Sequence, residues 1–480
     1  MDQFFRLIKK VLPKRLFSLF QPIYHYKLAL IGAFIYRFPS RKIKVVGITG
    51  TKGKTTTAEL VSSILEEAGH KTALMGTLRF KIAESEERNL YKMTMPGRFF
   101  VQYFLRRAVA AGCEWAVLEM TSEGVKQFRH KFIDLDALIF LNLAPEHIES
   151  HGSLERYVAA KFELAKSLEH SSKRPRAIVT NIDDALGEKF RGVSVENKKT
   201  FSLTDARPHT IGESGNVFTF KNTVIKTNLV GEFNIRNCLA AAVFAESQHI
   251  GVETIRKGLE KIKMVRGRVE FVEMGPFGSA QGKPLDKTRG KPFDDAQGKQ
   301  PFKVVVDYAH TPDSLEALYK AFKVPALRLA PKIQEGLTQG ENSYERKLIC
   351  VLGNTGGGRD IWKRPEMGKI ADAYCDEIIL TNEDPYDEDP RKIISDMEKG
   401  FSKHKPLIIL DRREAIREAL RLASYQSEKL AQDGNEHNKI VVLITGKGTD
   451  PYIMGPNGSK IMWDDASVVR EELKKLLASS

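Results

Sequence analysis

The sequence predicts an α/β protein built on mainly parallel sheets, and three observations support this. From Lys44 to the C-terminus, apolar runs of strand length alternate with stretches whose apolar residues recur at spacings of three and four. A glycine-rich turn joins the first run to the first helical stretch, and polar side chains follow several of the later runs directly. Alternating strands and helices of this kind are typical of parallel sheets covered by helices.

The first element is a basic, apolar segment over residues 1–42. Residues 1–44 hold ten cations and a single acid, Asp2. Their uninterrupted apolar run, Leu28 to Tyr36, is shorter than the roughly 20 residues that a membrane-spanning helix needs. No small-residue cleavage site follows it, which argues against a secretory signal. Two interpretations stay open: a segment that lies on anionic lipid, or a helical hairpin packed on the next domain.

The turn after the first strand predicts a phosphate-binding loop. Backbone N–H groups in a glycine turn and at a helix N-terminus bind anions, a lysine adds positive charge, and a threonine hydroxyl can ligate Mg²⁺. Ile48 stands where the strict pattern G-x-x-x-x-G-K-[ST] has its first glycine. The sequence therefore predicts a shorter form of a nucleoside triphosphate loop, made of Gly50, Thr51, Lys52, Gly53, Lys54, Thr55 and Thr56.

Apolar runs predict nine strands, and three polar residues follow two of them. Ligands bind at the carboxyl ends of strands in open α/β sheets, where Glu119, Asn142 and His147 are expected. A carboxylate beside a phosphate loop suits Mg²⁺, which prefers oxygen ligands. The predicted strands are Lys44 to Thr49, Trp115 to Glu119, Ala137 to Leu143, Ala177 to Asn181, Val304 to Tyr308, Leu348 to Gly353, Glu377 to Thr381, Leu407 to Leu410 and Ile440 to Thr445.

The alternating pattern pauses once, between Met264 and Glu270. The pause predicts a hinge near Arg266 between two α/β domains, at 43–265 and 266–480. Residues 277–301 are of low complexity and repeat Ala-Gln-Gly-Lys, which predicts a flexible surface insertion.

Composition narrows the class of protein. The 480 residues are 42% hydrophobic and 28% charged, which is typical of a soluble globular protein of two or three domains. The net charge of +14 comes in large part from the N-terminal segment, and no basic patch interleaved with aromatic residues follows, so we expect no nucleic-acid partner. The four cysteines lie far apart without C-x-x-C spacing, which indicates a reducing compartment and no zinc site.

Ordered motifs from Pro39 to the C-terminus make the chain resemble the Mur ligase family, the ATP-dependent peptide ligases of cell-wall precursor synthesis. The resemblance is greatest to members that add a diamino acid to UDP-N-acetylmuramoyl-L-alanyl-D-glutamate. It implies a central P-loop ATPase domain and a Rossmann-like C-terminal domain. The motifs are Gly50-Thr-Lys-Gly-Lys-Thr-Thr56, Glu119-Met-Thr-Ser-Glu-Gly-Val125, Asn142-Leu-Ala-Pro-Glu-His147, Tyr157-Val-Ala-Ala-Lys161, Gly231-Glu-Phe-Asn-Ile-Arg-Asn237, Gly267-Arg-Val-Glu270, Asp307-Tyr-Ala-His-Thr-Pro-Asp313, Arg359-Asp-Ile-Trp-Lys-Arg-Pro365 and Gly446-Lys-Gly448.

The resemblance also implies a reaction and its residues. A substrate carboxylate attacks the γ-phosphate of ATP to give an acyl phosphate, from which an amine then displaces phosphate. Lys54 holds phosphates, Thr55 and Glu119 hold one Mg²⁺, His147 helps to hold a second, and Lys161 matches a lysine that is carbamylated in the family. For the nucleotide, Asn234 and Asn237 lie near adenine, Asp307 contacts ribose, and Arg268 faces the nucleotide at the hinge.

Substrate residues follow the family pattern with exceptions. Thr94, Thr121, Gln127 and Arg129 match positions that contact the muramoyl-dipeptide, but Met95 replaces a threonine and Glu123 a histidine. For the incoming amino acid, the matching residues are Arg359, Glu383, Asp384, Gly446 and Asp450. Tyr386 stands where the diaminopimelate signature D-N-P-R has its arginine, so diaminopimelate and lysine both stay open.

The front of the chain departs from the family. Members carry a UDP-binding domain of about a hundred residues before the phosphate loop, and about 43 residues stand there in this sequence. We expect a cytoplasmic monomer, and peripheral contact of residues 1–38 with the inner face of the plasma membrane stays one of two open interpretations. The alternatives are a folylpolyglutamate synthase-like ligase and a non-catalytic, membrane-associated nucleotide-binding module.

Overall fold

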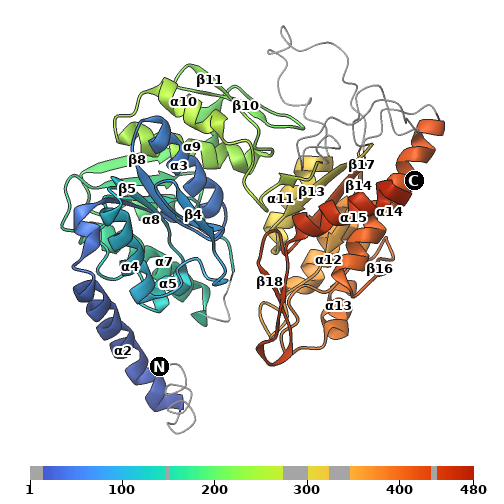
Figure 1. Ribbon diagram of the computed structural model, residues 1–480, viewed down its shortest axis with the longest axis horizontal. Coiled ribbons are helices and arrows are strands. Elements are labelled where there is room, and N and C mark those ends of the chain that lie inside the picture. Colours follow the sequence, from blue (N-terminus) through green and yellow to red (C-terminus); the bar gives the residue numbers. More distant parts are fainter. Residues whose placement is uncertain (1–13, 147–150, 274–300, 324–345, 434–439, 480) are drawn as a thin grey trace. The chain divides into compact units, whose positions relative to one another are not determined.

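The structure is a computed structural model, which describes residues 14–146, 151–273, 301–323, 346–433 and 440–479 (Figure 1). His147 and the predicted insertion at 277–301, apart from residue 301, lie outside the described residues. The chain divides into two compact units. The first comprises Met1–Arg207, Phe218–Ile225 and Phe233–Ile262, and the second comprises Pro208–Val217, Lys226–Glu232 and Lys263–Ser480.

The first unit is built on an eight-stranded sheet. Its six neighbouring strands β2, β5, β1, β6, β7 and β8 pair in parallel. The β2–β3 and β3–β4 pairs at one edge are antiparallel. The order places β1 at the centre, between the strands that end at Glu119 and Phe140. In spatial order the strands are β4 (Ser85–Arg88), β3 (Arg79–Ile82), β2 (Thr72–Met75), β5 (Trp115–Glu119), β1 (Lys44–Thr49), β6 (Ala137–Phe140), β7 (Ala177–Asn181) and β8 (Asn197–Phe201).

Helices cover both faces of this sheet, because its central strands are apolar on both sides. Alternate strand residues such as Val45, Leu118 and Phe140 pack in one core cluster with α4 and α7, while α3 contacts β1, β2 and β5 and packs against α10. The remaining helices flank these layers. Their bounds are α3 (Lys54–Glu67), α4 (Arg98–Ala110), α5 (Ser122–Lys126), α7 (Leu154–Glu169), α8 (Gly187–Arg191), α9 (Glu232–Ser247) and α10 (Val252–Lys261).

The N-terminal segment forms one long helix, α2 (Lys14–Ile35), which packs on α4. Its small residues Ala29 and Ala33 are buried in this contact, and Gly32 lies against Phe99. Among the described residues, no helix combines the length and hydrophobicity that a membrane crossing requires. The described part of this segment is therefore helical and packed on the next domain. The hairpin itself stays a prediction, because residues 1–13 lie outside the described residues, and so does the lipid contact.

The second unit contains a six-stranded sheet, parallel except for the β12–β13 pair. Its central strands β17 and β14 are apolar and fully buried over most of their length. In spatial order the strands are β12 (Glu270–Phe271), β13 (Lys303–Asp307), β17 (Ile440–Thr445), β14 (Lys347–Leu352), β15 (Glu377–Leu380) and β16 (Leu407–Ile408). The helices are α11 (Pro312–Lys323), α12 (Lys363–Tyr374), α13 (Pro390–Glu398), α14 (Arg412–Gln432) and α15 (Asp465–Ser479).

Two small sheets complete the fold, and residues 208–217, which precede most of the second unit in the sequence, belong to that unit. One sheet comprises β9 (His209–Ile211), β10 (Asn216–Phe220) and β11 (Thr223–Thr227), and the other comprises β18 (Tyr452–Met454) and β19 (Lys460–Met462). Glu213, which precedes β10, forms ion pairs with Lys303 at 2.6 Å and Arg346 at 2.5 Å in the second unit. This unit is therefore assembled from residues that lie far apart in the sequence.

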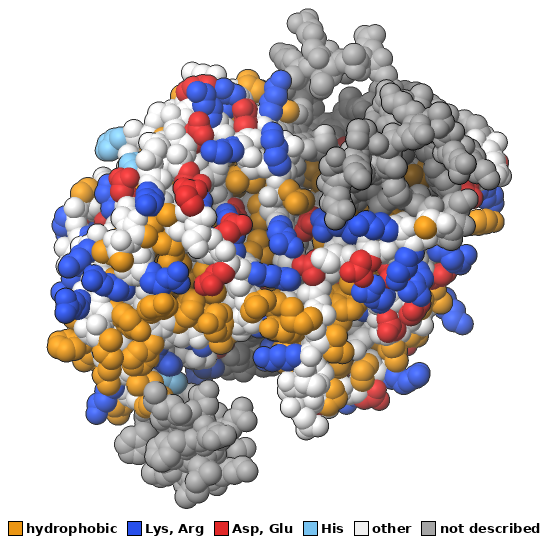
Figure 2. All heavy atoms as spheres, viewed as in Figure 1, with side chains coloured by type: hydrophobic (Ala, Val, Ile, Leu, Met, Phe, Trp, Pro, Cys, Tyr) orange, Lys and Arg blue, Asp and Glu red, His pale blue; other side chains and the backbone are white. Residues whose placement is uncertain are grey.

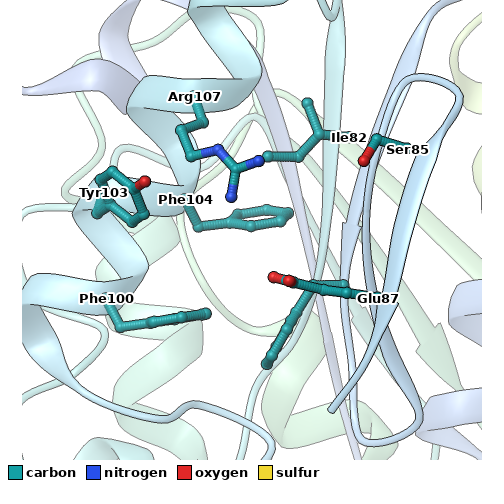
Figure 3. A pocket seen from close by; sticks show the side chains of 8 residues that line it. Ile82, Ser85, Glu87, Phe100, Tyr103, Phe104 and Arg107 are labelled. Atoms are coloured by element: carbon teal, nitrogen blue, oxygen red, sulfur yellow. The ribbon is translucent and has the colours of Figure 1, made fainter.

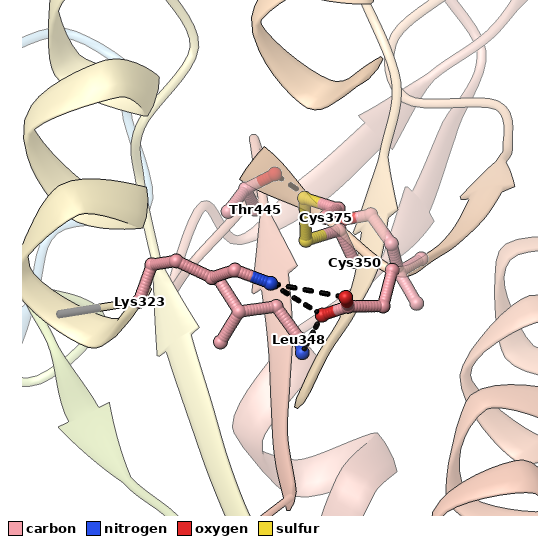
Figure 4. The surroundings of a disulfide bond; sticks show 7 residues. Lys323, Leu348, Cys350, Cys375 and Thr445 are labelled. Carbon is pink, nitrogen blue, oxygen red and sulfur yellow. Dashed lines mark hydrogen bonds and ion pairs between the residues drawn. A yellow bond between two sulfur atoms is a disulfide. The ribbon is translucent and has the colours of Figure 1, made fainter. Parts of the chain in front are cut away.

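A disulfide joins Cys350 of β14 to Cys375, at the end of α12 (Figure 4). Beside it, Asp376 accepts hydrogen bonds from Lys323 Nζ and from the backbone N–H of Leu348. The prediction from cysteine spacing, which favoured reduced thiols, is wrong for this pair. The 25 residues between the two cysteines carry no disulfide signal, and only the parallel pairing of β14 with β15 brings the cysteines together. Cys113 and Cys238 are buried and form no disulfide with each other or with the other two cysteines.

Candidate active site

The phosphate loop lies between β1 and α3 and is held by the neighbouring strand. The backbone N–H groups of Thr51 and Lys52 donate to Asn142 Oδ1 at 3.1 and 2.9 Å. Asn142 follows β6, which pairs with β1 in parallel register. Gly53 has a left-handed backbone (φ 84°), and a Cβ there would collide with the side chain of Asn237. Glycine is therefore required where the loop enters the helix.

Two lysines converge on the carbonyl of Gly50. Lys54 Nζ donates to Gly50 O at 2.8 Å and to Thr51 O at 2.9 Å, and Lys161 Nζ of α7 donates to Gly50 O at 2.7 Å. Lys161 is 2% exposed, and its burial, reinforced by the positive charge of Lys54, lowers its pKa well below the usual value. A lysine with a lowered pKa has more of the neutral, nucleophilic amine at neutral pH. Lys52 forms an ion pair with Glu146 at 3.2 Å.

Glu119 ends β5 beside the loop and is 1% exposed. Its carboxylate accepts hydrogen bonds from Thr55 Oγ1 at 3.0 Å, from Thr77 N at 2.8 Å and from Thr77 Oγ1 at 3.0 Å. The described residues include no group of three or more His, Cys, Asp or Glu side chains that would hold a metal by themselves. Mg²⁺ is bound by one or two protein oxygens together with phosphate, so Thr55 and Glu119 fit it as donors.

The predicted acceptor residues form a continuous series that starts at Glu119. Thr77 Oγ1 lies 2.9 Å from Thr94 Oγ1, and the carbonyl of the next residue, Met95, accepts a hydrogen bond from Arg129. Arg129 also donates to Gln127 Oε1 at 2.7 Å. Thr121 caps α5 by accepting from Gly124 N at 3.1 Å. The structure therefore brings Thr94, Thr121, Gln127 and Arg129 together beside the phosphate loop.

The two predicted adenine residues also lie beside the loop. Asn237 Nδ2 donates to Asn234 Oδ1 at 3.0 Å, and Asn237 Oδ1 accepts from Thr57 Oγ1 at 3.4 Å. Both asparagines are buried on α9.

The second unit holds a separate cluster of carboxylates. Lys447 Nζ is 1% exposed and donates to Asp384 Oδ1 and Asp450 Oδ2, both at 2.9 Å. Glu383 accepts from Thr355 Oγ1 at 3.0 Å, whereas its buried Oε2 has no hydrogen-bond partner among the described residues. Burial raises the pKa of Glu383, and Lys447 opposes this. Gly446 has φ 104°, and a Cβ there would collide with Glu383, so the glycine allows the carboxylate to approach.

Two arginines predicted to contact ligands lie over tyrosine rings in the second unit. Arg359 stands 5.0 Å from the ring of Tyr386, and Arg268 stands 4.5 Å from the ring of Tyr308. Asp307, the predicted ribose contact, accepts from Val269 N and Ala309 N, both at 2.7 Å. Its carboxylate therefore orders the turn after β13.

Sequence reasoning missed Thr77, Lys447 and Tyr157. Thr77 donates twice to Glu119, Lys447 is the cation of the carboxylate cluster, and Tyr157 OH lies 3.0 Å from Thr51 Oγ1. Lys447 lies inside the motif Gly446-Lys-Gly448, so the motif itself carried that signal. Thr77 stands in no motif. It donates to Glu119 because the turn after β2 places it beside that carboxylate.

A small pocket of the first unit lies between α4 and the β3–β4 hairpin (Figure 3). Phe80, Phe100 and Phe104 form its apolar wall, and Glu87 and Arg107 stand at its polar side. None of its lining residues is a predicted site residue.

Comparison with known proteins identifies relatives of the whole described chain. The family model described as the Mur ligase middle domain matches residues 48–245, and the one described as the Mur ligase, glutamate ligase domain matches residues 331–448. A UDP-N-acetylmuramoyl-L-alanyl-D-glutamate–2,6-diaminopimelate ligase of Syntrophomonas wolfei is 32% identical over 93% of this chain and 81% of the relative. The ligase of the same name from Synechococcus elongatus is 35% identical over 93% of this chain and 79% of the relative.

Solved structures agree with this. A structure of a ligase with the same name covers 91% of this chain and 79% of its own, with 26% identity and a TM-score of 0.54. Folylpolyglutamate synthase of Mycobacterium tuberculosis, complexed with ADP, has a TM-score of 0.61 over 94% of both chains. Its 15% identity establishes a shared fold alone.

Proposed function

Because this chain belongs to the Mur ligase family of ATP-dependent ligases, we propose that it joins a diamino acid to UDP-N-acetylmuramoyl-L-alanyl-D-glutamate in peptidoglycan precursor synthesis. The observation that carries the proposal is the buried Glu119–Thr55 pair beside the Gly50–Gly53 loop, next to the series that ends at Arg129. We assign the acceptor, the phosphates of the nucleotide and its adenine to residues 43–265. We assign the incoming amino acid to residues 266–480, which also supply the nucleotide contacts predicted for Asp307 and Arg268.

The chemistry makes an unreactive carboxylate into an acyl donor. An oxygen of the acceptor carboxylate bonds to the γ-phosphorus of ATP as the bond to the β-phosphate oxygen breaks and ADP leaves. The amine then bonds to the acyl carbon, loses a proton, and phosphate leaves. Lys54 compensates phosphate charge that develops during the transfer. Mg²⁺ held by Thr55 and Glu119 would neutralise further phosphate charge.

Lys161 has the surroundings that carbamylation needs. The neutral amine of a lysine bonds to the carbon of CO₂ and loses a proton, which gives a carbamate anion. The lowered pKa of Lys161 supplies the neutral amine, and Lys54 nearby compensates the new negative charge. We propose this modification, with the carbamate as a further oxygen ligand for a metal ion.

The carboxylates of the second unit suit a distal ammonium. Glu383 Oε2 lacks a partner in the described part of the chain, and Asp384 and Asp450 add negative charge. Tyr386, over which Arg359 lies, takes the place of the arginine in D-N-P-R. Diaminopimelate and lysine are therefore both candidate substrates.

One assay tests the proposal. ADP release is measured with the UDP-muramoyl-dipeptide and, in turn, diaminopimelate, lysine, ornithine and glutamate. We expect release only when the acceptor and a diamino acid are both present. Release with tetrahydrofolate and glutamate instead would identify a folylpolyglutamate synthase-like enzyme, and no release with any pair would identify a nucleotide-binding module.

We also propose that α2 holds the enzyme on anionic lipid from the cytoplasmic side. Large apolar residues are exposed on this helix, where hydrophobic side chains gather in Figure 2: Ile23, Leu30, Ile31, Phe34 and Ile35, with Phe34 75% exposed. Lys27 and Arg37 are exposed beside them, and no acid occurs between Asp2 and Glu59. An apolar face flanked by cations matches an anionic membrane surface.

Vesicle flotation tests the lipid contact. The protein should float with vesicles that contain phosphatidylglycerol, and Ile31→Ser with Phe34→Ser should abolish flotation. Tyr425→Ser, which changes an exposed ring on α14, is the matched control and should float as the unchanged protein does. If the unchanged protein stays with the soluble fraction, the lipid proposal is wrong.

A further inference from the structure

Two arginine side chains meet next to the acceptor residues without a counter-ion. Arg98 begins α4 and donates through Nε to Gln127 O at 2.8 Å, while Arg129 donates to Gln127 Oε1 at 2.7 Å. Both guanidinium groups therefore gather around one residue. Within the described residues neither forms an ion pair, and Glu123 acts on Arg129 only through its longer-range charge.

Burial makes this arrangement costly. Arg129 is 9% exposed and its buried Nε has no hydrogen-bond partner in the described structure. Burial and the charge of Arg129 lower the pKa of Arg98 to about 10, and burial lowers that of Arg129. Two like charges withdrawn from water destabilise each other. A bound oxyanion would remove this cost, because planar guanidinium groups bind carboxylate and phosphate oxygens in pairs.

Helix α2 supports both arginines. An N–H of Arg98 meets His25 Nδ1 of this helix. Burial and the charges of Arg98 and Arg129 lower the pKa of His25 to about 4, so the ring is neutral at pH 7 and accepts the hydrogen bond. The next residue of α2, Tyr26, contacts the rings of Phe128 and Phe132, with ring centroids 6.2 and 5.2 Å apart. These two residues precede and follow Arg129 in the sequence.

The position of the cluster indicates which molecule supplies the anion. From Glu119, contacts run through Thr77 to Thr94 and from the Met95 carbonyl to Arg129. The two arginines are therefore connected by a short series of contacts to Glu119, which lies beside the phosphate loop. This series includes Thr94 and Arg129, which are predicted to contact the acceptor.

Arg129 already matches a family position that contacts the acceptor. We propose that Arg98 joins it as a second arginine of an oxyanion site for the acceptor, and that His25 of α2 is a positioning residue that orients Arg98. The identity of the acceptor rests on the function proposed above. The oxyanion is a carboxylate of the peptide or a phosphate of the sugar nucleotide. In either case α2 acts in substrate recognition as well as presenting its apolar face.

Calorimetric titration tests the site in a Lys54→Ala background, which weakens anion binding at the phosphate loop. The ligands are glutarate, pyrophosphate, UDP, the muramoyl-dipeptide and the UDP-muramoyl-dipeptide. Arg98→Gln should weaken binding of the recognised ligands at least about tenfold, the effect of losing a charge-assisted hydrogen bond. Arg106→Gln, on the same helix, is the matched control and should change binding less than about twofold.

The pattern of losses identifies the oxyanion. A loss with glutarate and both muramoyl compounds assigns a carboxylate, and a loss with pyrophosphate, UDP and the UDP-linked compound assigns a phosphate. If Arg98 affects the simple anions while neither muramoyl compound binds, the site stands and the proposed acceptor is wrong. Equal binding by the background protein and its Arg98→Gln variant, or no binding of any ligand, overturns the site.

His25 is tested in the otherwise unchanged chain. His25→Ala should raise the KM for the acceptor several-fold and leave kcat unchanged, and His25→Gln, which keeps a hydrogen-bond acceptor, should restore most of the KM. Equal KM values for all three proteins would remove His25 from the proposal.

Discussion

The phosphate loop and the carboxylate cluster are built alike and charged oppositely. Each lies on loops that follow parallel strands, and each uses a glycine to let a side chain approach closely, Gly53 in one and Gly446 in the other. Around the loop, Lys54 and Lys161 point their ammonium groups at a carbonyl oxygen. In the cluster, Glu383, Asp384 and Asp450 surround the single ammonium of Lys447.

The difference teaches how one scaffold selects opposite ligands. A parallel sheet supplies position, and the residues after its strands supply charge. The cations and loop amides of the first unit suit phosphates and a carboxylate, whereas the acids of the second suit an amine. A reaction that joins an acid to an amine needs one site of each kind.

The largest expected effect is at the cationic site. Lys54→Ala should lower kcat about 10²–10³-fold, because it removes charge that stabilises the transferred phosphate. Lys52→Ala should cost less, since Glu146 already pairs with that lysine. Acceptor-dependent ADP release measures both. Equal rates for Lys54→Ala and the unchanged enzyme would remove the loop from the mechanism.

The next prediction concerns Lys447, the buried cation of the carboxylate cluster. Lys447→Met should destabilise the second unit by about 3–5 kcal/mol, because Asp384 and Asp450 then lie buried without their cation. Urea unfolding followed by circular dichroism measures the change. Lys460→Met, at an exposed position on β19, is the control and should leave the midpoint unchanged.

Glu383→Gln tests the acidic site by itself. We expect the KM for the amino acid to rise about tenfold or more, since a charged partner of the ammonium is lost, with the KM for ATP unchanged. Steady-state kinetics with each substrate varied separately give this result. A rise in the KM for ATP alone would contradict the assignment of Glu383 to the amine.

Lys161 tests whether the cationic site gains a negative charge. With ¹³C-bicarbonate, the unchanged protein should show a carbamate carbon signal by NMR that Lys161→Met lacks. The signal should fade as the pH falls, because protonation of the amine prevents carbamate formation. The same spectrum from both proteins would leave Lys161 as an unmodified cation.

The smallest effect concerns pH and α2. The pKa of His25 lies below its unfolded value, so the unfolded chain binds more protons between pH 6.5 and about 4, and stability from this contact is lost as the pH falls through that range. The charged and titratable groups that face His25 are Arg98, Arg129 and Tyr24. Amide hydrogen exchange in α2 at pH 7 and pH 5 measures the loss, and His25→Gln should reduce the difference.

Most central strands were predictable, and edge strands with polar sequences were not. The strand at Lys44–Thr49 and the strand at Ile440–Thr445 match their predicted bounds, because strands buried on both faces read as apolar runs. The strand at Ser85–Arg88, with the sequence Ser-Glu-Glu-Arg, is an exposed edge and gives no apolar signal. The mainly parallel α/β architecture itself is confirmed.

The site divides in the same way. Lys54 and Glu119 were predicted because a local motif and a strand end mark them. Lys447 lies in a motif, but its partner Asp384 is 63 residues away in the sequence, and only the folded chain shows that the two pair. His25 lies in no motif and its partner Arg98 is 73 residues away, so only the folded chain reveals it. His147 lies outside the described residues, and its metal role stays a prediction.

The pairing of Glu213 with Lys303 and Arg346 has a consequence for biosynthesis. Glu213 leaves the ribosome about 90 residues before its first partner and more than a hundred before its second. During synthesis, the Glu213 carboxylate therefore has neither of these partners until Lys303 and Arg346 have been translated. A nascent chain stopped near residue 262 would carry segments 208–217 and 226–232 without the unit to which they belong.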